Sequence, residues 1–564
     1  MAEAKIQFTP AQAAAIQARG GSLLVSAAAG SGKTRVLVER VAGLITDPDH
    51  PVDADSLLIM TFTNAAAAKL RADITKRLAA EIRQHPQDVR LRRQQMRLQR
   101  ASIGTVDAFC LHFVQQNFSA LDVPPDFTIA DDATLVRLQQ ETLSTVLEQA
   151  YTDPDFCAFA DLYDRGRTDD TTGRAVQELY HFTQALPHPA QALQRFVEMW
   201  QSDAPPEKTQ WGQAVLRETS ARIKGVLRLL RTAQKIAAKD PAADKALTAV
   251  LMDDEDRMLL VLDRLDHGAW DTVPEALDNA DNWRRAGRVP GGIASNIAAM
   301  SANMLRDRAK KQIATLRTDF LLCPAADYQA DRRRAAPLVA ALVRAVEQYR
   351  RTLLEAKLAE KVLDYADLEH MTLELLLTPE YERTSLCRTV SARYSAVLVD
   401  EYQDTNALQD AIYFALAAPD ASNLFFVGDI KQSIYRFRQA DPSVFVGKQT
   451  AWQPYPADAP VPYPEPATIA LDANFRSAPD VIRGINYFFE TFFSRRLGGI
   501  DYGDGQPCGG QKRRNLPRPV RAGCDPRSRY RGRCPHHCCT HCPDDGGWLP
   551  RAGRRTRQNP PLPV

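Results

Sequence analysis

The chain has 564 residues, of which 45% are hydrophobic and 25% are charged. This composition is typical of globular proteins and excludes collagen-like and wholly disordered chains. The length suits roughly three or four domains of about 150 residues each. The sequence shows no apolar run long enough to span a membrane and does not start like a signal peptide, which predicts a cytoplasmic protein without a membrane partner.

Charge and cysteine content divide the chain near residue 503. Residues 505–564 carry 13 Lys+Arg against 3 Asp+Glu, a balance of +10, which leaves residues 1–504 with a balance of −8. Six of the ten cysteines also lie in this last stretch. The other four are widely spaced, and we interpret them as reduced thiols: Cys110, Cys157, Cys323 and Cys387.

Apolar runs alternate with helical patterns at both ends of the first 450 residues. Residues 22–27 predict a strand, followed by a glycine-containing turn and a helix that begins at Lys33. Runs at 55–63, 394–404 and 423–429 predict further strands. This alternation favours an α/β fold with a parallel sheet, whose functional loops lie at the carboxyl ends of its strands.

The amino-acid composition changes between these regions. From about 116 to 360 the chain is rich in Ala, Leu, Gln, Glu and Arg, which predicts a large helical insertion. Residues 450–468 contain six prolines and predict a linker. A new strand and helix are predicted after it, from residue 469.

The stretch SAAAGSGKT, residues 26–34, has the pattern of a phosphate-binding loop. Small residues allow backbone N–H groups to surround phosphate oxygens, and the following helix points its positive end at the same anion. Lys33 can reach the β- and γ-phosphates, and the Thr34 hydroxyl can bind Mg²⁺. The alternative is a glycine-rich turn before an ordinary helix. The predicted ATP-binding residues of this loop are Ala27, Ala28, Ala29, Gly30, Ser31, Gly32, Lys33 and Thr34.

The acidic stretch DEYQD, residues 400–404, follows the predicted strand AVLVD. In a phosphate-loop enzyme, one carboxylate at this place holds Mg²⁺ and its neighbour polarises the attacking water. We therefore expect Asp400 to bind the metal and Glu401 to be the general base. The alternative is a strand that ends in solvated acids. The two elements together predict a nucleoside triphosphatase with ATP and Mg²⁺ as cofactors.

Further stretches resemble, in order, the motifs of superfamily 1 DNA helicases of the UvrD/Rep/RecB type. Among these, VLVDEYQDTN and VGDIKQSIYRFR most resemble the A subunits of bacterial AddAB (RexAB) helicase–nucleases. The stretches that carry the resemblance are FTPAQAAAI (8–16), TFTNAAAAKLR (61–71), IGTVDAFCLHF (103–113), KVLDYADLE (361–369), VGDIKQSIYRFRQADP (427–442) and LDANFRS (471–477).

The resemblance implies two RecA-like motor domains, 1A and 2A, with ATP bound between them and helical insertions, 1B and 2B, of which 1B is expected in this chain. The second motor domain is expected to be incomplete in this chain. The expected organisation is 1–115 first part of 1A, 116–360 insertion 1B, 361–449 second part of 1A, 450–468 linker, 469–502 start of 2A, and 503–564 basic tail.

The resemblance also implies roles for single residues around the nucleotide. Gln12 would read the adenine, and Phe475 would stack on it. Gln432 would sense the γ-phosphate, and Arg476 would act as an arginine finger. Without the motif, Arg476 would by default be read as part of a surface salt bridge.

A second implied group would contact a DNA strand. Aromatic side chains stack on bases regardless of sequence, although core packing is the alternative for such residues taken alone. Asp107 stands where many members of the group have His, and we assign it no role. Phe437 replaces the more usual Trp, and Gln439 replaces a Gly. The implied DNA contacts are Phe62, Thr63, Asn64, Thr105, Phe437 and Arg438.

The resemblance implies an ATP-dependent DNA helicase that forms part of a double-strand-break repair helicase–nuclease, with 3′→5′ travel. Its expected partners are single-stranded and duplex-end DNA and a B subunit. Because most of 2A and the nuclease domain are not encoded, we expect an impaired motor. The alternative function is an ATP-binding switch or assembly module that does not translocate.

The tail from residue 503 has three interpretations. It can be a basic segment that binds DNA phosphates, or the product of out-of-frame translation of a GC-rich gene, which we favour. It can also be a zinc site, with the possible ligands Cys534, His536, His537, Cys538, Cys539, His541 and Cys542.

Overall fold

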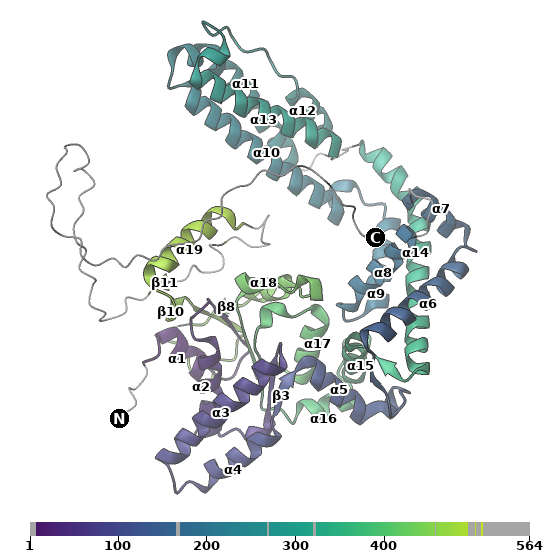
Figure 1. Ribbon diagram of the computed structural model, residues 1–564, viewed down its shortest axis with the longest axis vertical. Helices are drawn as coiled ribbons and strands as arrows, with labels where there is room; N and C mark the ends of the chain where they lie inside the picture. The colour runs from purple at the N-terminus through teal and green to yellow at the C-terminus, as the bar shows by residue number, and fades with distance from the viewer. Residues whose placement is uncertain are drawn as a thin grey trace, which may run out of the picture. The chain divides into compact units, whose positions relative to one another are not determined.

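The structure is a computed structural model that describes residues 7–164, 170–267, 270–319, 323–456, 458–494, 502 and 509–510. The elements that precede residue 118 and those that follow residue 361 come together in one α/β part, drawn in purple and in green in Figure 1. The chain between them is almost entirely helical. The tail and its possible zinc ligands lie outside the described residues, apart from Gly509 and Gly510.

A seven-stranded sheet lies at the centre of the α/β part. Its strand order is β3-β2-β6-β7-β1-β9-β8, and every neighbouring pair is parallel. The expected parallel α/β fold is therefore confirmed. The strands are β1 Leu23–Ala27, β2 Leu57–Thr61, β3 Ser102–Thr105, β6 Ala396–Val399, β7 Leu424–Gly428, β8 Gln453–Pro454 and β9 Ala467–Leu471.

Helices cover both faces of this sheet, because alternate strand residues face two separate cores. Leu24 and Phe426 pack in one core with α5 and α15, whereas Val25 and Phe425 pack in the other with α1, α2 and α3. The α-helices of this part are α1 Pro10–Gln17, α2 Lys33–Thr46, α3 Asn64–Gln84, α4 Val89–Arg97, α5 Val106–Asn117, α15 Tyr365–Leu376, α16 Ser385–Ser391, α17 Ala407–Leu416, α18 Pro442–Ala451 and α19 Pro479–Phe492. The short 3-10 helices used below are η6 Tyr402–Asp404, η7 Ile430–Gln432 and η8 Arg436–Arg438.

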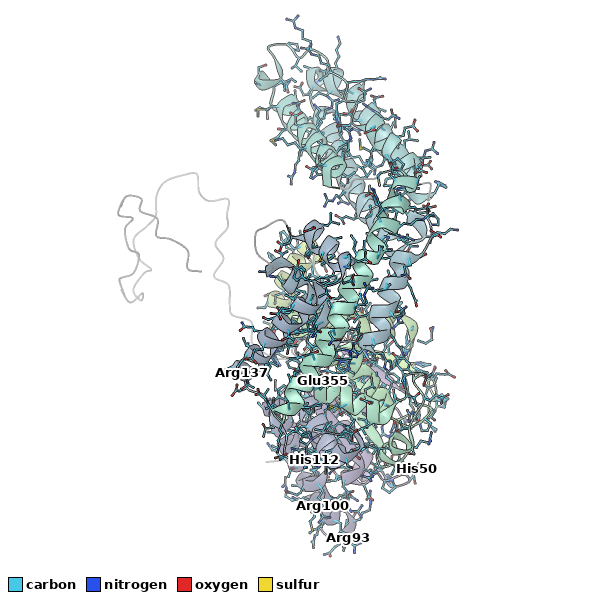
Figure 2. The ribbon with its side chains drawn as sticks, turned by 90° about the vertical axis from the view of Figure 1, so that its right-hand side faces the viewer. His50, Arg93, Arg100, His112, Arg137 and Glu355 are labelled. Atoms are coloured by element: carbon cyan, nitrogen blue, oxygen red, sulfur yellow. The ribbon has the colours of Figure 1, made fainter. Side chains whose placement is uncertain are left out.

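The helical insertion contains two cores. One surrounds the long helix α14, against which α6 packs; Figure 2 marks these two helices by Glu355 and Arg137. The other core lies in the bundle of α10–α13. Two short strands, β4 Thr128–Ile129 and β5 Val362–Leu363, pair where the insertion leaves and rejoins the α/β part. The insertion helices are α6 Asp132–Ala150, α7 Pro154–Tyr163, α8 Asp170–Gln184, α9 Pro189–Gln201, α10 Gln210–Ala237, α11 Pro241–Asp266, α12 Thr272–Ala280, α13 Ile297–Asp319 and α14 Ala325–Ala359.

The structure differs from the expected boundary between linker and second motor domain. The predicted start of 2A at residue 469 lies inside β9, which pairs with β1 from Leu23↔Ala467 to Ala27↔Leu471. The predicted linker includes β8, which pairs with β9. The physical reason is that β1 is an apolar strand with two edges, and β9 satisfies the backbone groups of the edge that β7 leaves open. After β9, the chain forms β10 Ala473–Asn474, which pairs with β11 Gly509–Gly510.

Helix α19 follows β10 and exposes an apolar face that includes Val481, Ile485, Phe488 and Phe492. Such a continuous exposed face marks a surface that is normally covered by another part of a protein. Of the helices that the structure describes, none is long and apolar enough to cross a membrane. The four cysteines outside the tail are free thiols, as expected.

A buried ion-pair network fixes the point where the insertion returns to the sheet. The Lys357 ammonium is fully buried, and its Nζ lies 2.6 Å from Asp364 and 2.9 Å from Asp367. The Asp364 side chain also caps α15 by accepting a hydrogen bond from the Asp367 N–H. One ammonium therefore holds the end of α14 against the start of α15.

We expect Lys357→Met to lower the free energy of unfolding by about 3–5 kcal/mol, because it leaves two buried carboxylates without their cation. Lys361→Met is the control, since Lys361 pairs with Asp126 at the surface and its loss should change stability little. Urea denaturation followed by circular dichroism measures both. Equal losses in the two variants would contradict this account of the network.

Candidate nucleotide-binding site

The loop between β1 and α2 has the backbone of a phosphate-binding loop. Gly30 and Gly32 have φ angles of 73° and 87°, in the left-handed region that glycine adopts at low cost. The loop leads directly into the amino end of α2 at Lys33, where free N–H groups and the helix dipole favour an anion. The buried Ser31 hydroxyl has no partner among the described residues, so this loop retains a polar group that a bound phosphate can satisfy.

The segment after β9 holds this loop in place. The Asn474 amide donates a hydrogen bond to the Ala29 carbonyl (2.7 Å), and the Phe475 N–H donates to the Gly30 carbonyl (2.9 Å). The Asn474 side-chain oxygen accepts from the backbone N–H of Arg476 (2.8 Å). Phe475 and Arg476 are exposed next to the loop, as their predicted roles require. Sequence reasoning gave Asn474 no role, although it lies within the quoted LDANFRS motif.

Gln12 also contacts the loop. It occupies the third position of α1 in a capping box with Thr9, and its amide donates a hydrogen bond to the Ser31 carbonyl at 2.8 Å. The side chain is buried. In this structure its amide therefore positions the loop, and its reading of adenine stays a prediction.

Lys33 and the acidic stretch meet across the carboxyl ends of β1 and β6. The Lys33 ammonium lies 3.0 Å from the Glu401 carboxylate. Glu401 has a φ angle of 52°, a strained conformation for a residue with a side chain. Burial, together with the neighbouring Glu401 charge, raises the pKa of Asp400 to about 6. A buried, under-neutralised carboxylate next to a phosphate loop fits a Mg²⁺ site, with Thr34 exposed on the first turn of α2.

A hydrogen-bonded chain continues from Glu401 to the end of β7. The Gln403 amide donates to Glu401 (2.9 Å) and to Asp404 (3.0 Å), and its oxygen accepts from the Asp429 N–H (2.8 Å). The Gln432 amide donates to the Asp429 carboxylate at 2.7 Å. Gln432 is thus connected to Glu401 through two residues. Both linking residues, Gln403 and Asp429, lie inside motifs that sequence reasoning had quoted without assigning them.

An aromatic cluster lies directly after Gln432. The rings of Phe62 and Tyr435 are 4.4 Å apart, and the Arg438 guanidinium lies 5.7–6.0 Å from the rings of Phe62, Tyr435 and Phe437. Phe437 is 77% exposed. The structure therefore brings together Phe62, Phe437 and Arg438, which the resemblance implied as DNA contacts, and adds Tyr435, which sequence reasoning missed. An exposed ring beside an arginine can stack on nucleic-acid bases.

The other predicted DNA contacts have structural roles in the described chain. The Thr63 hydroxyl caps α3 by accepting from Ala66 N–H (3.1 Å), and the Thr105 hydroxyl caps α5 by accepting from Ala108 N–H (3.2 Å). Asn64 is exposed at the start of α3. Their contacts with DNA remain predictions.

A cavity of about 410 Å³ extends between Glu401 and the aromatic cluster. Asp107, to which sequence reasoning assigned no role, lines it and shares a side-chain hydrogen bond with Glu369. Burial raises the pKa of both carboxyls, that of Glu369 to about 8, while the Arg438 charge opposes the rise at Asp107. The Gln409 amide donates to Glu369 at 2.8 Å. This pair therefore holds a proton near neutral pH.

Comparison with known proteins places this arrangement in a family. Residues 8–453 match the UvrD/REP helicase N-terminal domain. The chain belongs to this helicase family. It is 34% identical to the A subunit of the ATP-dependent helicase/nuclease of Moorella thermoacetica over 89% of this chain and 36% of the relative. For the subunits of the same name from Desulforamulus reducens and Anoxybacillus flavithermus, the identities are 35% and 34%, over 88% of this chain and 40% and 41% of the relatives.

The curated relatives are much longer than this chain, which spans about two-fifths of their length. The family match covers the strands β1–β3, β6 and β7 of the sheet, the helical insertion, the phosphate loop and the aromatic cluster. The predicted resemblance to UvrD/Rep helicases and to the A subunits of helicase–nucleases is confirmed. What the full-length relatives do is carried over to this chain only as a proposal.

Asn474→Ala should weaken the binding of a fluorescent ATP analogue about five- to tenfold, since one net hydrogen bond that positions the loop contributes about 1 kcal/mol. Asp472→Ala, in the same segment but exposed, is the matched control and should bind normally. Fluorescence titration gives both affinities. Unchanged binding in the Asn474 variant would show that the loop keeps its shape without this contact.

Glu369 predicts a pH dependence of stability. Its pKa in the folded chain is raised to about 8 from an ordinary value of 4.5, so the folded state retains a proton that the unfolded state releases. Its contribution to stability is complete below the ordinary value and is lost as the pH rises through about 8. Between about pH 5 and pH 8.5 this group should lower the free energy of unfolding by up to about 1.4 kcal/mol per pH unit.

Glu369→Gln should remove this part of the pH dependence, because the amide does not titrate. Glu374→Gln, on the exposed face of the same helix, should leave the dependence unchanged. Denaturation curves at several pH values measure the difference between each variant and the parent chain. A Glu369 variant with the parental slope would rule out the protonated pair.

Proposed function

We propose that this chain is the ATP-driven motor part of a DNA helicase that acts in double-strand-break repair. The relatives, which are named as A subunits of ATP-dependent helicase/nucleases, support this assignment. The observation that carries it is the continuous path from Lys33 through Glu401, Gln403 and Asp429 to Gln432. The path ends three residues before Tyr435, in the aromatic cluster.

Bound ATP, together with Mg²⁺, would supply a phosphoanhydride bond. Hydrolysis of this bond would drive the movement of the motor. The loop N–H groups and Lys33 would bind its phosphates, and Thr34 and Asp400 would hold the metal. Lys33 is paired with Glu401 in the described state. Phosphate binding would draw Lys33 away, which frees Glu401 to accept a proton from water. Arg476, next to the loop, would stabilise the charge that develops in the transition state.

The release of Glu401 from Lys33 would change the position of the aromatic cluster. Gln403 donates to both Glu401 and Asp404 and accepts from Asp429, so a shift of Glu401 changes the bonds that hold Asp429 and Gln432. Because η7 and η8 are separated by only three residues, such a change moves Tyr435, Phe437 and Arg438. These side chains would hold and release the bases of a single strand, and 3′→5′ travel follows from the family resemblance.

The proposed partners are single-stranded and duplex-end DNA and a B subunit. The relatives are named as one lettered component of their enzyme, which supports a heteromeric assembly. An ATP-binding switch without translocation is the alternative. A switch requires the same nucleotide site but does not require an exposed aromatic cluster. The presence of this cluster therefore favours the motor.

ATP hydrolysis by this chain, measured with and without oligothymidylate, tests the proposal. We expect the low rate of an impaired motor, stimulation of this rate by the oligonucleotide, and a loss of about 10²–10⁴ in rate in Glu401→Gln. Phe437→Ala should raise the half-saturating DNA concentration roughly 5- to 100-fold, since a stacked base contributes about 1–3 kcal/mol. Phe182→Ala, which removes a similarly exposed ring on α8, is the control and should have no effect.

The outcome separates the two functions. The switch is favoured if Lys33→Ala abolishes nucleotide binding, while neither DNA nor Phe437→Ala changes it. Hydrolysis that is insensitive to Glu401→Gln would contradict both the assigned base and the motor.

A further inference from the structure

The α10–α13 bundle carries a charged surface that none of the nucleotide or DNA motifs explains. Residues 282–311, which form the loop before α13 and the first part of that helix, contain seven Lys or Arg residues and a single acidic residue, Asp307. The chain up to residue 504 has a negative balance overall. This concentration of positive charge is therefore local.

Two adjoining hollows lie along this stretch, with volumes of about 960 Å³ and 600 Å³. They share Ile293, Asn303 and Asp307. The smaller hollow follows α13 and combines Met300 and Met304 with Arg308 and Lys311. The lining of the larger hollow includes an indole and five basic side chains: Trp283, Arg284, Arg285, Arg288, Arg306 and Lys310.

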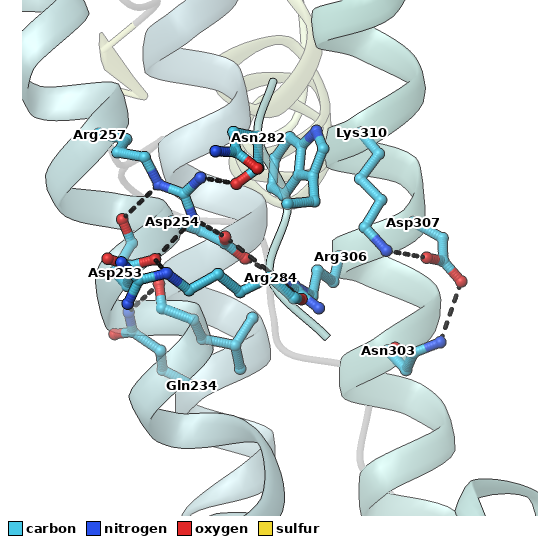
Figure 3. A network of polar contacts seen from close by, with 12 residues as sticks. Gln234, Asp253, Asp254, Arg257, Asn282, Arg284, Asn303, Arg306, Asp307 and Lys310 are labelled. Carbon is cyan, nitrogen blue, oxygen red and sulfur yellow. Dashed lines mark hydrogen bonds and ion pairs between the residues drawn. The ribbon is translucent and has the colours of Figure 1, made fainter. Parts of the chain in front are cut away.

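A buried ion pair fixes the position of one of the side chains that line the larger hollow. The Arg306 side chain of α13 is 2% exposed, and its Nε lies 2.6 Å from Asp254 of α11, which is fully buried. The same guanidinium donates to the Arg284 carbonyl at 2.8 Å and lies 5.8 Å from the Trp283 ring. Figure 3 shows this network between the two helices and the loop. The loop that carries the outer arginines is therefore held in a defined position.

Four of the cations along these hollows have no ion-pair partner among the described residues. Lys310 pairs with Asp307 at 3.0 Å. By contrast, within the described ranges of the chain, Arg285, Arg288, Arg308 and Lys311 form no ion pair and no side-chain hydrogen bond. Four positive charges thus surround the hollows without compensation, and each is available to a carboxylate from outside.

Exposed apolar side chains lie beside these charges. Ile297 is 80% and Met304 is 65% exposed, and Met300 is also exposed. Their spacing of three and four residues puts them on one stripe of α13. Methionine and arginine are enriched at protein interfaces, where the flexible thioether adapts to a partner. An apolar stripe with a basic border is the complement of an acidic amphipathic helix.

We propose that this surface, formed by residues 282–311, docks an acidic amphipathic segment of a protein partner. Apolar anchors of that segment would fill the hollow along Met300 and Met304, and its carboxylates would pair with Arg285, Arg288, Arg308 and Lys311. This inference does not depend on the proposed motor function.

Two other occupants fit less well. A DNA backbone would pair with the arginines but would leave Ile297, Met300 and Met304 in water, since phosphates carry no apolar group. The chain's own residues 505–564, with a balance of +10, would be repelled by the four cations. A segment with both acidic and apolar side chains would pair with the four cations and would also cover the apolar stripe.

The test uses the full chain without nucleotide and a fluorescein-labelled synthetic helix of about 18 residues, with leucines spaced to form one stripe and glutamates elsewhere. Anisotropy should show saturable binding that weakens with added salt. Met304→Asp and Arg308→Glu should each weaken it about fivefold or more. Arg228→Glu, an exposed arginine on α10 of the same bundle, is the matched control and should bind like the parent.

Thermal melts confirm that each variant is folded. A helix with lysines in place of the glutamates should not bind. The proposal is overturned if the acidic helix does not bind up to about 1 mM, or if it binds equally to all three variants. It is also overturned if a labelled DNA duplex of about 20 base pairs binds in its place and is sensitive to Arg308→Glu but not to Met304→Asp, which would mark a nucleic-acid surface.

Discussion

The backbone pairing of β1 with β7 on one side and β9 on the other determines where every part of the nucleotide site lies. Because all seven strands are parallel, their carboxyl ends meet at one edge of the sheet. The phosphate loop, the acidic stretch, the Gln432 segment and the Asn474 segment each follow a different strand. They come together only because this register holds, although more than 360 residues separate the phosphate loop from the other three.

The electrostatics of that edge follow from burial. Several carboxyls are packed there with few cations, and burial raises the pKa of Asp400, Asp404 and Glu369. Lys33 and Lys431 supply opposing charges on the nucleotide side, where Lys431 lies 2.9 Å from Asp429, and Arg438 supplies one on the aromatic side. The positive charges at this edge are too few to neutralise its carboxylates. Binding a metal ion or moving one of these cations therefore redistributes protons and hydrogen bonds along the edge. This gives a physical basis for linking the two sides.

Sequence reasoning predicted the features that depend on neighbouring residues. The phosphate loop, the strand ends and the helical insertion are local patterns, and the motifs identified the family. It did not find contacts between distant residues, such as Asp107 with Glu369 or Asn474 with Ala29, because single residues in a motif do not reveal their partners. It also placed the start of the second domain at residue 469, inside β9, since a short apolar run does not show which sheet it joins. The division of the insertion into two cores was likewise not visible.

The pairing of β1 also has a consequence for biosynthesis. Both neighbours of β1 are made long after it, and β9 begins at Ala467. At ordinary elongation rates, about 20 to 90 s separate the emergence of β1 from that of β9. During this interval an apolar strand with unpaired edges leaves the ribosome ahead of a large helical segment that can fold first. The nucleotide loop is therefore among the first parts of the chain to be translated and among the last to acquire its final shape.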